Sequence, residues 1–427
     1  MSDYNVLWHR YGLKDSPYFV NPLSNTGDLP LTLFIGRQEE RRKLGNIISL
    51  GEARCIVVGE PGVGKTTLVN FVRQEASNNQ FFTPSREIEI NRPMDGNELI
   101  ILTLGAIHDE IKLLNIQIEQ ELMQKLDALY ELTQYGELTP EIANISQLNR
   151  SKLVELFREV VAKIVHPRYK GIILHYDNLD NIDNPQDIVE LLSDIRDFFL
   201  TSKVIFIFVG DNFLPQIIHM RPRISQIFVN TPVDVKPFSF EDILKILNQR
   251  LEFIKITDGT TVILPHTEEA VKKLFDLHDG NLREILNSLT ECINETASSN
   301  TPILITEDIL CDILSRKVNE NYINKLSPED KKILEIMLNK EDHITPTELS
   351  KISGKSIQNI SSKYLQKLTR IGAVRFKEAD GRNRYYEVTP VIKWWKLQRS
   401  EREKQESKRK AQEQVEKILN RSLKDFI

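Results

Sequence analysis

The chain has 427 residues, of which 40% are hydrophobic, and a formal net charge of −5 at pH 7, which predict a soluble globular protein of two to four domains. No apolar run approaches the ~20 residues of a membrane span, and the N-terminus lacks the basic and apolar regions of a signal peptide, so we expect a cytoplasmic protein without membrane contact. Cys55, Cys292 and Cys311 lie far apart without metal-site spacing, which argues against disulfides and zinc.

The first segment leads into a helix. Residues 1–33 contain prolines and glycines without a regular period, so we expect an irregular segment. Residues 34–44 predict a turn, containing Ile35 and Arg37, and then a helix whose early acidic residues suit the helix dipole.

A phosphate-binding motif follows. Residues 54–58 are a β-branched apolar run typical of a buried strand, and apolar residues recur at helical spacing after residue 66. Between them the sequence matches G-x-x-x-x-G-K-[ST], the P-loop, in the strand–loop–helix context that the motif requires. The motif consists of Gly59, Glu60, Pro61, Gly62, Val63, Gly64, Lys65 and Thr66. A chance match on a surface loop is the alternative, which the flanking elements disfavour.

The motif predicts a site for a nucleoside triphosphate with Mg²⁺. Backbone N–H groups at the loop and the helix N-terminus, Thr67 included, can surround a phosphate. Lys65 would reach the β- and γ-phosphates, and the Thr66 hydroxyl would ligate Mg²⁺. Because the turn at Ile35 and Arg37 comes just before the strand of the P-loop, we expect it near the base of the nucleotide.

A second nucleotide motif lies at Asp177. Residues 86–91 alternate as a strand does, and residues 97–166 carry long helical patterns. Residues 171–177 are an apolar strand that ends in Asp177, which could hold Mg²⁺ through water. Any buried strand can end in Asp, but the position after a P-loop favours function.

The residue after Asp177 is an amide, Asn178, which can orient water but cannot take its proton. Glu60, Asp180 and Asp183 are candidates to replace a missing base. Alternatively these acids are solvated loop residues or helix caps, and hydrolysis is slow.

Further polar groups are expected beside the phosphates. Residues 204–209 predict an apolar strand after a helix at 188–200, and Asn212 follows that strand. Since ligands bind at the carboxyl ends of parallel strands, three strands would deliver polar groups to one edge. Arg223, before a predicted strand at 226–229, could reach the γ-phosphate of a neighbouring subunit, or be an ordinary surface arginine.

From Val233 the pattern becomes helical and remains so to about Arg316. Arg283 lies in the first turn of a helix, where a cation opposes the dipole. A nucleotide phosphate would explain this placement, and so would a salt bridge to a nearby acid.

The C-terminal part is basic. Residues 316–427 hold 26 Lys and Arg against 16 Asp and Glu, a net of +10, whereas the preceding 315 residues hold 30 against 45, a net of −15. Residues 326–390 predict three helices and a hairpin, as in a winged helix-turn-helix. The first two helices have Ser327 and Thr345 as caps.

The third predicted helix, 356–369, would bury Ile357, Ile360, Tyr364, Leu365 and Leu368. Its other face suits the major groove, and the hairpin would touch phosphate or the minor groove. The candidate DNA contacts are Lys355, Gln358, Ser361, Ser362, Lys363, Gln366, Lys367, Arg382 and Arg384. Winged helices also dock proteins, and that alternative stays open.

Together these segments resemble an AAA+ ATPase of the replication-initiator clade, the origin-recognition-complex type, whose members also end in a winged helix. The resemblance covers most of residues 34–390, and it implies ATP as the nucleotide and contact between subunits of a homo-oligomer. Gly59 to Thr66 resembles Walker A and Asp177 resembles Walker B; Asn212, rather than Asp211, falls at sensor 1, Arg283 at sensor 2 and Arg223 at the arginine finger. Asn178 departs from the Glu usual in that clade, which puts efficient hydrolysis in doubt.

The sequence therefore predicts an α/β fold: an AAA+ P-loop parallel sheet with a helical lid, then a winged helix and a charged C-terminal helix. The expected segments are 1–33, 34–232, 233–316, 320–392 and 393–427. The favoured function is an ATP-dependent switch that binds duplex DNA. The alternative is a signalling, transposition or defence ATPase that assembles with a protein partner, since Tyr11-Gly12-Leu13 and Pro17-Tyr18-Phe19 are similar to segments of transposon target-selection ATPases.

Overall fold

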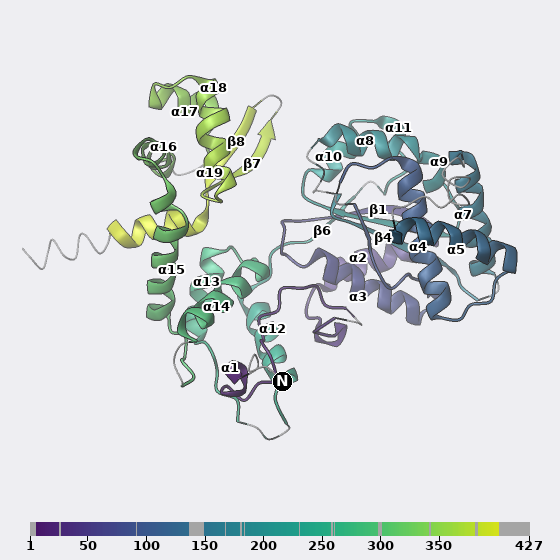
Figure 1. Cartoon of the computed structure of the whole chain (residues 1–427), viewed down its shortest axis with the longest axis horizontal. Coiled ribbons are helices and arrows are strands. Elements are labelled where there is room, and N and C mark those ends of the chain that lie inside the picture. The colour runs from purple at the N-terminus through teal and green to yellow at the C-terminus, as the bar shows by residue number, and fades with distance from the viewer. Residues whose placement is uncertain are drawn as a thin grey trace, which may run out of the picture. The chain divides into compact units, whose positions relative to one another are not determined.

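The structure is a computed structural model (Figure 1). It describes residues 6–24, 27–90, 92–135, 149–166, 168–179, 182, 184–229, 231–257, 259, 261–297, 301–340, 343–380 and 383–400. Asp180, Asp183, Arg382 and most of the predicted C-terminal helix lie outside these ranges. The chain divides into one unit of Pro17–Phe253 with Asn281–Arg283, and another of Met1–Ser16, Ile254–Gly280 and Glu284–Ile427.

A parallel sheet forms the centre of the first unit. Its described strands are β1 (Ala53–Val58), β2 (Phe81–Phe82), β3 (Ile88–Glu89), β4 (Gly171–Asp177), β5 (Val204–Gly210) and β6 (Val233–Asp234). The order is β2-β4-β5-β1-β6, and β3 pairs with the end of β4 beyond β2. The long strands are buried on both faces, which is why they appear as continuous apolar runs in the sequence. The predicted strands at 54–58, 171–177 and 204–209 are confirmed.

Two predicted strands need correction. The strand expected at 86–91 is only two residues long, Ile88–Glu89. The strand expected at 226–229 is wrong, because the turn after α11 (Pro222–Ser225) continues to Phe228, whose N–H is bonded to the carbonyl of Ser225. Val229 donates its N–H to β1, at the carbonyl of Arg54. The last strand is instead β6, at the start of the region predicted to be helical.

Helices cover both faces of the sheet. One face carries α2 (Gln38–Ile48) and α3 (Lys65–Asn78). The other carries α4 (Gly96–Leu113), α5 (Gln120–Tyr135), α7 (Arg150–Val165), α8 (Pro185–Asp194) and α9 (Arg196–Phe199). Short helix α10 (Leu214–His219) and α12 (Phe240–Phe253) complete this unit.

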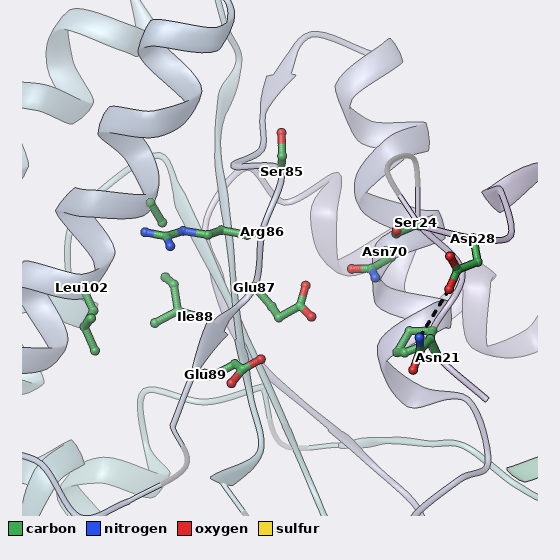
Figure 2. Close-up of a pocket in the computed structure, with 13 residues that line it drawn as sticks. Asn21, Ser24, Asp28, Asn70, Ser85, Arg86, Glu87, Ile88, Glu89 and Leu102 are labelled. Carbon is green, nitrogen blue, oxygen red and sulfur yellow. Dashed lines mark hydrogen bonds between the residues drawn. The ribbon is translucent and has the colours of Figure 1, made fainter. Parts of the chain in front are cut away.

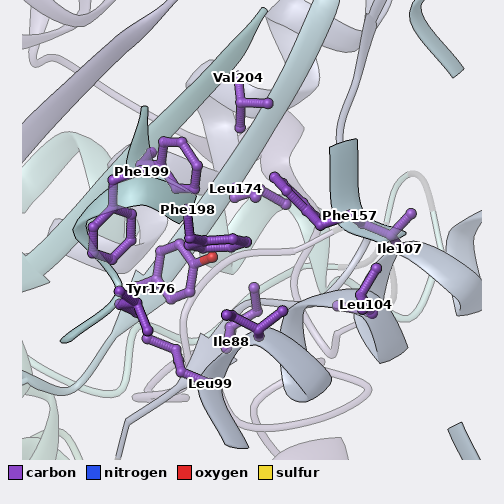
Figure 3. Packing of buried hydrophobic residues seen from close by; sticks show 14 of the residues in the cluster. Ile88, Leu99, Leu104, Ile107, Phe157, Leu174, Tyr176, Phe198, Phe199 and Val204 are labelled. Atoms are coloured by element: carbon purple, nitrogen blue, oxygen red, sulfur yellow. The ribbon is translucent and has the colours of Figure 1, made fainter. Parts of the chain in front are cut away.

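Alternation along the strands assigns each residue to a face. In β5, Ile205 and Ile207 pack with α2 and α3, whereas Phe206 and Phe208 pack on the opposite side. Tyr176 belongs to that opposite side, where Figure 3 shows it among aromatic and aliphatic side chains. Since side chains alternate, the next residue of β4, Asp177, must face α3.

The neighbouring edge strand, β3, follows the same alternation. Figure 2 shows Ile88 on the side of Leu102 from α4, and Glu87 with its carboxylate on the side of Asn70 from α3. Ile88 is paired with Tyr176, and Glu89 with Asp177. Glu89 of β3, and Glu87 just before this strand, therefore share the α3 face with Asp177.

In the second unit, helices pack with the N-terminal segment. The helices are α1 (Val6–His9), α13 (Glu268–Leu277), most of α14 (Leu282–Thr296) and α15 (Glu307–Asn321). Tyr11 is buried, and its hydroxyl bonds both the carbonyl and the N–H of Ile303 at 2.9 and 3.0 Å. No helix among the described residues is long and apolar enough to cross a bilayer.

The second unit also holds three helices followed by a two-stranded hairpin, the element order of a winged helix-turn-helix. They are α16 (Pro328–Leu338), α17 (Pro346–Ser353), a third helix made of α18 (Ile357–Asn359), a π-helical turn (Ile360–Leu365) and α19 (Gln366–Arg370), and then β7 (Val374–Asp380) and β8 (Asn383–Val388). The predicted caps Ser327 and Thr345 both form capping boxes.

The third helix departs from the prediction at one position. Ile360, Tyr364, Leu365 and Leu368 are buried as predicted. Ile357, however, is 49% exposed, so its predicted place in the core is wrong. An extra residue in a π turn rotates the preceding residues by about 100°, which turns Ile357 away from the shared face.

Candidate functional site

The P-loop connects β1 to α3, and its shape depends on glycine. Gly62 and Gly64 have φ angles of +89° and +94°, which residues with a side chain rarely adopt. A Cβ on Gly62 would also lie 2.5 Å from Asn281 Oδ1 and 2.7 Å from Arg283 Cβ. The loop therefore has a fixed backbone with another segment packed closely against it.

The two polar side chains of the motif have defined partners. Lys65 Nζ donates to the carbonyl oxygens of Gly59 and Glu60, at 2.8 and 3.2 Å. The Thr66 hydroxyl donates to Asp177 Oδ2 at 2.6 Å. The structure thus brings together the lysine, the hydroxyl and the carboxylate that the sequence predicted from separate motifs.

Asp177 is buried at the end of β4. Burial raises the pKa of Asp177, while the hydrogen bonds from Thr66 and from the Asn178 N–H, at 2.8 Å, act in the opposite direction. A hydroxyl and a carboxylate are hard oxygen ligands of the kind that Mg²⁺ takes together with waters and substrate phosphates. The residues present therefore fit Mg²⁺.

Arg73 of α3 and His175 of β4 form a buried pair near Asp177, and the sequence did not predict this pair. An Arg73 guanidinium nitrogen lies 3.3 Å from His175 Nδ1 and 3.1 Å from Asn70 Oδ1. Burial and the charge of Arg73 hold the pKa of His175 well below its ordinary value, so the imidazole is neutral. Burial also lowers the pKa of Arg73, to about 10. The signal was His175 itself, a polar residue within an apolar strand, two positions before Asp177.

Arg37 is buried beside the P-loop. It donates to the carbonyl of Val63 at 2.7 Å and to that of Lys236, and it lies 3.9 Å from the ring centroid of Phe238. Burial lowers the pKa of Arg37, and the ion pair with Glu40 at 3.2 Å opposes that shift. Arg37 therefore supports the loop backbone directly. Contact of Arg37 and the half-buried Ile35 with the base stays a prediction.

Asn281, just before α14, and Arg283, in its first turn, also contact the P-loop. Asn281 Nδ2 donates to the carbonyl of Pro61 at 2.7 Å, and Arg283 lies against Gly62. Arg283 is exposed, as the second residue of α14. The structure thus places Arg283 at the phosphate loop from a distant part of the sequence.

Other predicted residues are less closely tied to the loop. The Thr67 hydroxyl accepts a hydrogen bond from the N–H of Leu23, at 3.3 Å, and so holds the N-terminal segment. Asn212 is exposed in the turn after β5, whose last residue, Gly210, is paired with Val58. Because β5 lies between β1 and β4, the three carboxyl ends meet at one edge of the sheet. Arg223 is exposed on α11, and its role stays a prediction.

The predicted DNA face divides into two sets. Gln358, Ser361, Ser362, Lys363, Gln366 and Arg384 are exposed. Lys355 instead pairs with Glu329 at 2.7 Å, and Lys367 pairs with the buried Asp330. These two lysines form ion pairs with acids of α16. The exposed cations of this face include Lys363 and Arg384.

Part of the first unit matches a family of known proteins. Residues 33–207 match the family described as AAA ATPase domain. An uncharacterized HTH-type transcriptional regulator of Methanocaldococcus jannaschii, MJ0774, is 23% identical over 398 residues, which cover 90% of this chain and 93% of that protein.

Two solved structures have a similar fold. The Walker-type ATPase PABY2304 of Pyrococcus abyssi has a TM-score of 0.51 at 14% identity, with 89% of this chain and 99% of that chain covered. The ORC2 protein of Aeropyrum pernix has a TM-score of 0.50 at 14% identity, with 89% and 94% covered. The chain therefore has a P-loop AAA+ fold, and residues 33–207 are similar to the AAA ATPase domain family.

Proposed function

We propose that the protein is an ATP-dependent switch that binds and hydrolyses ATP with Mg²⁺ and engages duplex DNA through its winged helix. The observation that carries the proposal is the meeting of Lys65, Thr66 and Asp177 at the P-loop, with Asn281 and Arg283 against the same loop.

Each residue has a defined task at the nucleotide. Lys65 exchanges its bonds to loop carbonyls for bonds to phosphate oxygens. Thr66 and Asp177 would hold Mg²⁺, which would neutralise charge on the phosphates. Asp177 is kept in place by the N–H of Asn178.

The first turn of α14 is the element through which ATP acts on the rest of the chain. The helix dipole makes a cation in the first turn electrostatically unfavourable. A phosphate near Arg283 would make the net interaction favourable. Since Asn281 already bonds the P-loop, a triphosphate would strengthen this contact, and ADP would do so less.

The proposal of DNA binding rests on the C-terminal module and its charge. Residues 316–427 carry a net of +10, and the third helix presents polar side chains such as Gln358 and Ser361. The M. jannaschii relative is named as an HTH-type transcriptional regulator, and the A. pernix structure as an ORC2 protein, names that fit this use.

The DNA part is tested by charge reversal at the exposed cations. The double variant K363E/R384E should weaken binding to a mixed-sequence duplex and make binding less dependent on salt, because each lost phosphate contact removes about 0.9 from the slope of log K against log salt. The control K152E changes an exposed lysine of α7, in the other unit, and should bind as wild type. Equal loss in both would show a general charge effect and contradict the proposed face.

A second function, assembly with a protein partner, is favoured by two exposed apolar residues. Ile352 and Ile357 are 59% and 49% exposed on α17 and α18. Molecular mass measured by light scattering, with and without ATP and in the absence of DNA, distinguishes the two functions. Assembly that needs only ATP supports this alternative.

If Arg223 is an arginine finger, the variant R223A should weaken ATP-driven self-assembly or hydrolysis.

A further inference from the structure

Asn178, the residue after Asp177, suits the backbone conformation at this position. Its φ is +66°, in the left-handed region that Asn tolerates, and where other L-residues cost about 1–2 kcal/mol. Its N–H is already bonded to Asp177 Oδ1. Its amide cannot take a proton from water, so a base for hydrolysis has to be another residue.

The pairing of β3 with β4 places a carboxylate beside Asp177. Glu89 is the register partner of Asp177, and the N–H of Ile90 donates to the Asp177 carbonyl at 2.9 Å, which fixes that register. Paired residues in neighbouring strands lie about 4.8 Å apart, with side chains on the same face. Glu89 is also the last residue of β3, at the carboxyl edge where ligands bind in parallel sheets.

Glu89 is also open to water. Its side chain is exposed and lines a cavity of about 560 Å³, together with Glu87 and with Asn70 of α3 (Figure 2). The intervening Ile88 is buried in the core on the opposite face, so β3 cannot turn over without exposing it. The carboxylate is therefore held on the side of Asp177 and remains accessible.

We infer that Glu89 is the general base of ATP hydrolysis, in the place that Asn178 cannot fill; this rests on the proposed function of the same site. The oxygen of a water molecule attacks the γ-phosphorus, and the bond from that phosphorus to the bridging oxygen of ADP breaks. The proton of the water passes to the Glu89 carboxylate and then to the released phosphate, so the products are ADP and inorganic phosphate.

Glu87 is the closest competitor, two residues earlier on the same face. It lies further from the carboxyl edge, and its negative charge acts on two buried groups: it offsets the effect of burial on the pKa of Arg73, and it adds to the rise in the pKa of Asp177. Because Glu87 acts on the buried Arg73, it is suited to be the charge partner of that arginine. A base at Glu87 is the alternative that the experiment must separate.

The experiment compares E89Q, E87Q and the control E155Q, an exposed glutamate of α7, in the full chain. Affinity is measured with fluorescent ATP and Mg²⁺, hydrolysis by released phosphate, and folding by the thermal midpoint. The nucleotide that remains bound after incubation with ATP is identified by chromatography.

For E89Q we expect ATP affinity within about twofold of wild type, hydrolysis slowed at least about 100-fold, and ATP rather than ADP retained on the protein. E155Q should match wild type in every readout. Hydrolysis at the wild-type rate in E89Q, or a larger loss in E87Q, would overturn the assignment. If wild type hydrolyses ATP no faster than K65A, the proposed ATPase function fails, and the assignment of Glu89 with it.

Discussion

At Gly62, backbone conformation and close packing each exclude a side chain. Its φ is +89°, and a Cβ would meet Asn281 and Arg283 within 2.7 Å. We predict that G62A lowers the free energy of unfolding by clearly more than about 1 kcal/mol, because both effects add. Urea denaturation measures this loss.

Two other glycines separate these effects. Gly51 has a φ of +80° with nothing within 4 Å of a built Cβ, so G51A should show the backbone cost alone. Gly45 lies within α2 with open space around it, so G45A should stabilise by about 0.5–1 kcal/mol. If G62A cost no more than G51A, the contact with Asn281 and Arg283 would not contribute.

Lys65 is the residue whose loss should affect ATP most directly. Hydrogen bonds to a charged group contribute about 1.5–3 kcal/mol, so K65A should weaken ATP binding about 10- to 100-fold. Calorimetric titration with ATP and Mg²⁺ gives the affinity. The control is K152A, which changes an exposed lysine of α7. Unchanged ATP affinity in a folded K65A protein would show that the nucleotide binds elsewhere.

Residues of the site differ in how far the sequence predicted them. Lys65, Thr66 and Asp177 belong to short motifs with a fixed chemistry, so they could be found without a structure. The pairing of Arg73 with His175 could not be predicted, because it depends on α3 crossing β4 at one register, although His175 alone stands out as a polar residue in an apolar strand. Glu89 was missed for the same reason, since only the pairing of β3 with β4 places it beside Asp177.

Among the elements, α17 shows how a cap couples stability to pH. The Glu348 carboxylate accepts hydrogen bonds from Lys340 Nζ at 2.6 Å and from the N–H of Thr345 at 2.9 Å, which lower the pKa of Glu348 to about 2. A depressed carboxyl pKa stabilises the fold above the ordinary value of 4.5, and that contribution is lost as the pH falls from 4.5 towards 2.

The variant E348Q tests this coupling. Wild type should be more stable than E348Q at pH 6, and the difference should shrink between pH 4.5 and 2.5, because protonated Glu348 is neutral and no longer forms an ion pair with Lys340. Urea denaturation across that range measures it. A difference that stays constant with pH would show that the ion pair with Lys340 does not stabilise α17.

Strands were predicted well where they are buried on both faces and poorly at the edges. β4 and β5 are long apolar runs, and their limits were found within a residue. β2, β3 and β6 have two residues each, and partners across the sheet define them rather than their own sequence. The π turn in the third helix likewise has no sequence signal, and it moved Ile357 out of the core.

On the scale of the whole molecule, the charges of the chain are separated. In the proposed function the basic region from residue 316 onwards binds DNA, and the acidic remainder holds the P-loop that binds ATP with Mg²⁺. The residues that join them in the proposal are Asn281 and Arg283, because they contact the P-loop while the rest of α14 belongs to the second unit.

The most direct test is the affinity for duplex DNA measured by fluorescence anisotropy with ATP and Mg²⁺, with ADP, and without nucleotide. Sites coupled through a conformational change typically alter each other's affinity about 5- to 150-fold. We predict that ATP changes the Kd for DNA at least about fivefold in wild type and leaves it unchanged in K65A. The same Kd in all three conditions, for a wild-type protein that binds ATP, would contradict the switch.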